Sequence, residues 1–232
     1  MKQMGMVAEN IEAIRARMRG AAERVGRDPD SVRLVAVSKR QSLEVIREAM
    51  ACGQTVFGEN YLQEAEEKVA ALGQGLAWHC IGHLQSNKAR IAAEIFDCIE
   101  TIDRLKLAKA LEIRLAELGK TMPVLVQVNV GGEAQKAGVA PEEAGQLCRE
   151  LQQFPHLRLQ GLMTMPPFFE DPEESRGYFR RLRLLGDELA AQGLLGRHGM
   201  VQLSMGMSGD FEVAIEEGAT LVRVGTALFG ER

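Results

Sequence analysis

Aromatic residues are scarce in this sequence. They make up 5% of its 232 residues, with one tryptophan and two tyrosines, whereas 46% of the residues are hydrophobic. A large core must therefore be built mainly from small aliphatic side chains, which suits helices packed closely on a parallel sheet. The length is ordinary for one α/β barrel.

Long apolar runs are also missing. No segment is long enough to span a bilayer, so no membrane span is expected. The first residues lack an apolar run after a basic patch, so no secretory signal is expected either. The formal net charge is −4, and no basic stretch is dense enough to predict nucleic-acid binding. Charges of both signs are mixed along the expected helix faces without a clear dimer patch, which favours a monomer.

Cysteine is infrequent, and its spacing gives no pairing pattern. The four cysteines, Cys52, Cys80, Cys98 and Cys148, include no Cys-x-x-Cys arrangement. Reduced thiols in a cytoplasmic protein are the simplest interpretation. None of these residues ends an expected strand beside a visible base, so no thiol nucleophile is predicted.

Two familiar ligand motifs are absent as well. No Gly-x-Gly-x-x-Gly follows the first expected strand, so the dinucleotide-binding fingerprint is missing. His79 and His83 are close in sequence, but their spacing crosses from a strand to a loop and no carboxylate pair accompanies them. No metal site is therefore predicted, and we expect Trp78 and His79 to pack in or near the core.

Short apolar runs alternate with helical patterns along most of the chain. The runs are not alternating apolar and polar, as expected for strands buried on both faces. They predict strands at residues 32–38, 55–58, 77–81, 98–101, 123–129, 157–163, 201–204 and 220–225. The helical patterns lie at residues 6–25, 43–51, 62–72, 88–94, 105–118, 141–153, 173–192 and 211–217.

Eight strands of this kind are most simply closed as a (β/α)8 TIM barrel of the α/β class, here with an extra N-terminal helix. A doubly wound open sheet is the alternative. No internal repeat, low-complexity tract or linker interrupts the pattern, so residues 1–232 are expected to form a single domain.

Lys39 stands at the carboxyl end of the first expected strand, the edge at which barrel enzymes keep their chemistry. An amine held in apolar surroundings has a lowered pKa and can attack a carbonyl carbon to form a Schiff base. The alternative is that the strand simply ends there and the Lys39 side chain extends into water.

The ends of the last two expected strands carry glycine and hydroxyl residues. Residues 204–210 (Ser-Met-Gly-Met-Ser-Gly-Asp) follow the seventh strand, and Gly225 and Thr226 follow the eighth. Barrels commonly bind phosphate with these two loops, through backbone N–H groups and hydroxyls. The alternative for Ser208 and Asp210 is to cap the helix that follows.

Arg223 is expected on the same side of the eighth strand as Leu221 and Gly225. A buried arginine needs an acceptor, which a structural ion pair or a ligand could supply. A phosphate loop, a strand-end lysine and an inward arginine together indicate a site for a phosphorylated aldehyde. Pyridoxal 5′-phosphate (PLP) and a phosphorylated sugar in a Schiff-base aldolase both fit these residues.

Six blocks of the sequence resemble the pyridoxal phosphate homeostasis protein family, in order and over nearly the whole chain. They are residues 36–39, 57–61, 78–88, 161–165, 204–210 and 223–230. The resemblance implies a fold like the barrel domain of alanine racemase, with PLP held on Lys39 as an internal aldimine.

The resemblance also implies how the other site residues act. Ser204, Gly225 and Thr226 would contact the phosphate. Arg223 would face the pyridine nitrogen or its surroundings. Asn60 and Met205 would line the site.

The family is regarded as non-catalytic, with roles in vitamin B6 supply and in amino- and keto-acid balance. The resemblance therefore implies an intracellular PLP carrier, with PLP-dependent apo-enzymes as candidate recipients. The residues agree with that function. A guanidinium at Arg223 would leave the pyridine nitrogen unprotonated, which makes the ring a weaker electron sink.

A PLP-dependent amino-acid racemase is the competing hypothesis, and a scaffold for partner enzymes is a third. Racemisation needs a second acid or base opposite the lysine. Tyr61 begins an expected helix and Tyr178 falls on an outer one, so neither is a convincing candidate. Few residues follow the eighth expected strand, so the further β-domain of the racemases is not expected in this sequence.

Overall fold

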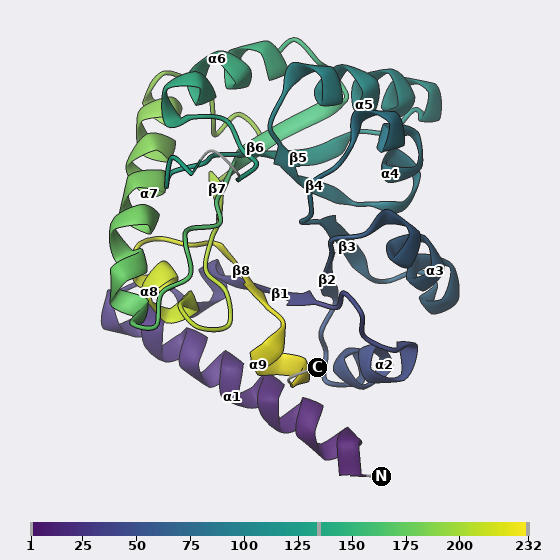
Figure 1. Cartoon of the computed structure of the whole chain (residues 1–232), viewed down its shortest axis with the longest axis vertical. Coiled ribbons are helices and arrows are strands. Elements are labelled where there is room, and N and C mark those ends of the chain that lie inside the picture. Colours follow the sequence, from purple (N-terminus) through teal and green to yellow (C-terminus); the bar gives the residue numbers. More distant parts are fainter. Residues whose placement is uncertain (1, 134–135, 231–232) are drawn as a thin grey trace.

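The computed structural model describes residues 2–133 and 136–230. Eight parallel strands form a closed barrel in sequence order, and helices surround it (Figure 1). The strands are β1 (Arg33–Val37), β2 (Val56–Glu59), β3 (Ala77–Cys80), β4 (Cys98–Ile102), β5 (Met122–Gln127), β6 (Leu157–Met163), β7 (Gln202–Ser204) and β8 (Leu221–Val224).

The helices follow the strands in the order of a TIM barrel, after one helix that precedes β1. They are α1 (Lys2–Arg24), α2 (Leu43–Ala51), α3 (Leu62–Leu72), α4 (Ala89–Ile95), α5 (Leu105–Leu118), α6 (Pro141–Leu151), α7 (Arg176–Ala191), α8 (Phe211–Glu216) and α9 (Thr226–Phe229). The long first helix lies along the outside of the barrel and packs against α2, α8 and α9 (Figure 1).

The strands bury both of their faces, as their continuous apolar sequences predict. The outward faces join the helices in one large core, to which Ile99 of β4 and Phe57 of β2 belong. A smaller cluster fills the barrel interior with Val35, Leu125 and Met163. Leu221 of β8 joins that inner cluster, so the inward side of β8 is the side expected from its alternation.

The closed barrel confirms the expected fold class, and the open-sheet alternative is wrong. Most element ends differ from expectation by one or two residues. Three short 3-10 segments, η1 (Pro29–Ser31), η2 (Ser86–Lys88) and η3 (Pro172–Ser175), and the one-turn helix α9 were not expected. A single turn is too short to show helical periodicity. None of the helices within the described ranges is both long and apolar enough to cross a membrane.

Gly161 allows β6 and β7 to approach each other closely. A Cβ atom at this position would lie 1.8 Å from the carbonyl oxygen of Gln202, its partner on β7. Backbone atoms of a paired strand cannot move aside as the end of a flexible side chain can. Gly161 is therefore required by the packing of two strands.

We expect Gly161→Ala to destabilise the protein by about 3 kcal/mol or more, because the added methyl group forces the two strands apart. Gly177→Ala is the matched control, since a Cβ there has no atom within 4 Å. Alanine favours a helix over glycine, so the control should be stabilised by about 0.5 kcal/mol. Denaturant unfolding of both variants measures the difference, and equal stabilities would contradict the assignment.

Candidate functional site

A pocket of about 270 Å³ opens at the carboxyl ends of the strands. The loops after β1, β2, β3, β6, β7 and β8 supply its walls. Its lining residues are Val37, Lys39, Asn60, Ile81, Met165, Phe168, Phe169, Met207, Ser208, Gly209, Asp210, Arg223, Gly225 and Thr226. Most of this lining is apolar, and the polar groups converge from a few loops, as is typical of a ligand site.

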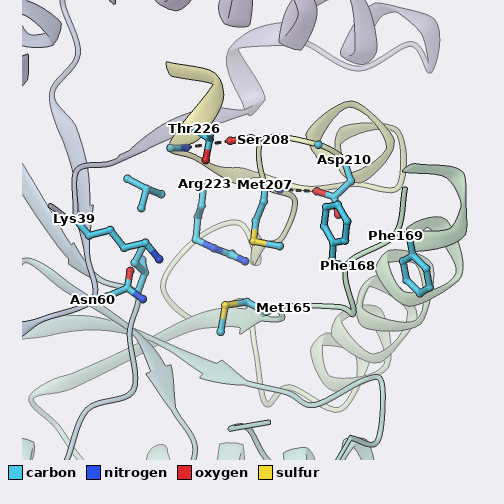
Figure 2. A pocket seen from close by; sticks show the side chains of 14 residues that line it. Lys39, Asn60, Met165, Phe168, Phe169, Met207, Ser208, Asp210, Arg223 and Thr226 are labelled. Carbon is cyan, nitrogen blue, oxygen red and sulfur yellow. Dashed lines mark hydrogen bonds between the residues drawn. The ribbon is translucent and has the colours of Figure 1, made fainter. Parts of the chain in front are cut away.

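Five of the seven residues expected at the site line this pocket. Lys39 and Asn60 enter from one side, and Arg223 stands beside them (Figure 2). Gly225 and Thr226 lie at the loop after β8. The pocket thus brings together residues from the two ends of the sequence.

Ser204 and Met205 are not among the residues that line the pocket; both are buried beneath it. The Ser204 hydroxyl donates to Oε2 of Glu100 and accepts a hydrogen bond from the Arg223 guanidinium at 2.5 Å. Arg223 also donates to the carbonyl oxygen of Thr164 at 2.8 Å. Ser204 therefore bridges two buried charges below the pocket.

Glu100 provides the negative charge of this buried network. Its Oε1 lies 2.6 Å from Nδ1 of His79. Burial alone would raise the pKa of Glu100, but His79, Arg223 and Ser204 outweigh that effect and hold the pKa below its ordinary value. Burial lowers the pKa of Arg223, yet a guanidinium stays protonated in proteins. Arg223 thus faces the pocket as a cation with a fixed orientation.

Ser208 connects the loops after β7 and β8. Its hydroxyl oxygen accepts a hydrogen bond from the backbone N–H of Gly225 at 3.3 Å (Figure 2). It accepts a second one from the N–H of Ala227 at 3.2 Å. These two N–H groups therefore converge on one point at the edge of the pocket. Because the Ser208 oxygen already accepts these two hydrogen bonds, its O–H proton is left to donate to an anion in the pocket.

Asp210 does not cap α8 with its side chain, although it is the residue that precedes the helix. Its Oδ1 instead accepts a hydrogen bond from the backbone N–H of Met207 at 2.6 Å. This contact shapes the loop after β7 and turns it along the pocket wall. The capping alternative for Ser208 and Asp210 is therefore not what the structure contains.

Two features of the pocket bear on ligand binding: an unsatisfied polar atom and a close approach of two loops. The side-chain oxygen of Asn60 is buried and has no hydrogen-bond partner within the described ranges, so a donor on a ligand would satisfy it. A Cβ on Gly225 would lie 3.3 Å from Cβ of Val37, so glycine keeps the two loops close together. The Lys39 amine, the Asn60 amide and the hydroxyls of Ser208 and Thr226 together fit a phosphorylated aldehyde.

The described residues also bear on metal binding and on thiol reactivity. No group of three or more His, Cys, Asp and Glu side chains in the described part of the chain is arranged to hold a metal ion. The four cysteines are unpaired with one another. Burial raises the pKa of Cys80 and Cys148 to about 12, which disfavours the nucleophilic thiolate.

Sequence reasoning missed Glu100, Ser208 as a loop bridge, and the apolar wall of the pocket. Glu100 gave a readable signal, because it is a lone carboxylate inside an apolar strand. The wall consists of Met165, Phe168 and Phe169, from the loop after β6. That loop has no periodic pattern, and only folding places it beside Arg223.

Comparison with known proteins places this architecture in a family. Residues 10–232 match the family model described as alanine racemase, N-terminal domain. A pyridoxal phosphate homeostasis protein of Pseudomonas aeruginosa is 49% identical over 231 residues, which are 99% of this chain and 97% of the relative.

Two solved structures share the fold. PipY of Synechococcus elongatus, with PLP bound, is 38% identical with a TM-score of 0.83, covering 97% of this chain and 100% of PipY. An alanine racemase of Clostridium difficile is 16% identical with a TM-score of 0.76, covering 98% of this chain and 57% of the racemase. That second likeness concerns the barrel fold alone.

The full-length matches to homeostasis proteins and the match to the racemase barrel model lead to the same assignment. The chain belongs to the pyridoxal phosphate homeostasis proteins, within the alanine racemase N-terminal domain family.

Proposed function

We propose that this protein binds PLP in the barrel-mouth pocket, covalently through Nζ of Lys39, and serves PLP homeostasis without catalytic turnover. The main support for this proposal is that Lys39, Arg223 and the loop after β8 line the same pocket. Relatives of similar length bear the name pyridoxal phosphate homeostasis protein, and PipY has been solved with PLP bound.

In this proposal, different pocket residues bind the aldehyde and the phosphate of PLP. The PLP aldehyde condenses reversibly with a primary amine and releases water, which is the chemistry that the cofactor supplies when bound. Lys39 provides the amine, and Asn60 offers an acceptor beside it. The hydroxyls of Ser208 and Thr226 would bind the phosphate, with Ser208 held in place by the N–H groups of Gly225 and Ala227.

Ser204 and Met205 have a supporting role in this proposal. Ser204 fixes Arg223 from below, and Met205 packs in the core. Arg223 would then present its positive charge to the ring of the cofactor. The expectation that Ser204 contacts the phosphate is replaced here by Ser208, which stands between the two loops.

The proposed absence of turnover is supported by the residues around the pocket. Racemisation needs a second acid or base on the face opposite the lysine. Neither tyrosine belongs to the described pocket lining: Tyr61 is exposed at α3, and Tyr178 stacks on Phe169 with ring centroids 5.7 Å apart. Asp210 is the one carboxylate in that lining, and it accepts a backbone hydrogen bond.

The proposal includes the setting of this function. Residues 1–232 would act as one PLP-binding domain, as a monomer in the cytoplasm. PLP-dependent apo-enzymes would receive the cofactor. The reduced thiols and mixed surface charge expected from the sequence support this setting.

We expect Lys39→Ala to abolish covalent attachment of PLP, because the amine at the tip of β1 is lost. Wild-type protein incubated with PLP and reduced with borohydride should carry the fixed group on the Lys39 peptide, as mass spectrometry can locate. Lys88→Ala, which removes an amine from the loop after β3, is the control and should label as the wild type does. Labelling of Lys39→Ala to the wild-type extent would refute the attachment point.

We expect Thr226→Glu to weaken PLP binding by about tenfold or more, since like charges about 4 Å apart repel by about 1–4 kcal/mol. Thr226→Gln introduces a side chain as long as glutamate but without its charge, and it serves as the control. Fluorescence titration with PLP measures both affinities, and the difference should shrink at high salt. Equal affinities for the two variants would place the phosphate elsewhere.

We expect no sustained racemisation of alanine or serine by the PLP-loaded protein, because the one other acid or base in the described pocket lining, Asp210, already accepts the N–H of Met207. Chiral chromatography of each amino acid after long incubation measures the exchange. Multiple turnovers that disappear in Lys39→Ala would establish the racemase alternative instead.

A further inference from the structure

Helix α3 contacts the backbone beside Lys39 through a buried amine. Nζ of Lys68 donates to the carbonyl oxygen of Ser38 at 2.6 Å, one residue before Lys39. The same Nζ donates to Oε1 of Glu59 at 2.8 Å and to Oε1 of Glu64 at 2.6 Å. All three donor positions of the ammonium group are thus used, and one of them holds the tip of β1.

A second contact holds the residue that follows Lys39. The backbone N–H of Arg40 donates to Oε1 of Glu64, the same oxygen that accepts from Lys68. Arg40 has φ of 60°, the left-handed region that residues other than glycine rarely adopt. The peptide groups on both sides of Lys39 are therefore tied to one side-chain pair on α3.

The Ser38 side chain completes this arrangement. Its hydroxyl donates to Oε1 of Glu59 at 2.7 Å. Glu59 ends β2, so the tips of two neighbouring strands share one carboxylate. None of these contacts involves the Lys39 side chain, which lies in the pocket (Figure 2).

The charges of Lys68 and Glu59 are buried, and removing them from water costs free energy. Lys68 is 4% exposed and Glu59 is fully buried. Burial raises the pKa of Glu59, and the hydrogen bond and charge of Lys68 oppose that shift. A buried ion pair adds little net stability, because desolvation offsets its attraction. Its clear effect here is geometric, since it fixes the main chain around Lys39.

We propose that Glu64 and Lys68 are positioning residues that clamp the main chain around Lys39 before the cofactor arrives. This inference rests on the proposed attachment of PLP to Lys39. The clamp would hold Arg40 in its left-handed conformation and aim the lysine into the pocket. Because the strand tip is already ordered, PLP binding would not carry the entropy cost of ordering it, and the affinity would be higher.

The test uses three variants of α3. We expect Glu64→Ala to raise the dissociation constant of PLP about tenfold. This factor corresponds roughly to the free-energy cost of ordering the backbone of one residue. Glu64→Gln keeps an oxygen that accepts from Arg40 and Lys68, and should remain within about twofold of the wild type. Glu67→Ala removes an exposed carboxylate from the same helix, and should match the wild type.

Two measurements separate positioning from general stability. Melting of each cofactor-free variant reports whether α3 still folds, and the rate of adduct formation reports whether Lys39 is correctly aimed. A slower rate in Glu64→Ala with an unchanged melting temperature, restored in Glu64→Gln, would support the clamp. Wild-type rate and affinity in Glu64→Ala would overturn it.

Amide hydrogen exchange tests the clamp without any substitution. The N–H of Arg40 should be protected in cofactor-free wild-type protein, although Arg40 is exposed. Protection that appears only after PLP is added would overturn the preformed clamp. Failure of wild-type protein to form a borohydride-fixable adduct would instead overturn the proposed function. The hydrogen exchange of the Arg40 N–H would still show whether the clamp is preformed.

Discussion

The pairing of β1 with β8 is the contact on which the site depends. These strands come from opposite ends of the sequence, and their register places Val35 beside Arg223 and Ala36 beside Val224. Lys39 follows one strand and Gly225 the other, so closure of the barrel brings the amine and the loop after β8 to the same rim. An open sheet with the same eight strands would leave these edges apart. The chemistry of the site is thus a consequence of closure.

Closure also explains why charges are buried around the pocket. Arg223 must be accompanied by a carboxylate inside the barrel, and Glu100 meets that need through Ser204. On the other side, Lys68 and Glu59 occupy the space between β2 and α3. Each group is paired, because an unpaired buried charge would be strongly destabilising. The two networks are independent: one holds the Arg223 side chain from within the barrel, and the other holds the main chain on either side of Lys39 from outside it.

The sequence predicted the barrel because strand signals are local: short apolar runs bounded by polar residues. It predicted Lys39 and Arg223 because strand ends share a rim in every parallel barrel. It did not distinguish Ser204 from Ser208, because both belong to one loop motif and only the side-chain directions separate them. Lys68 could not be predicted either. Its sequence context is that of a surface lysine on an amphipathic helix. The carbonyl group of Ser38 to which it donates is distant in sequence.

A site that holds an aldehyde and a site that turns over a substrate make different demands. Holding needs an oriented amine and an anion-binding loop, and in the proposed function Lys39 would supply the amine and the loop that contains Ser208 would bind the anion. Turnover needs further acid–base groups and exclusion of water. The mouth here is bordered by Phe168, which is 85% exposed, so water reaches the rim. A lysine at an open pocket mouth, with the main chain on both sides of it tied to α3, supports the proposed reversible attachment over the racemase alternative.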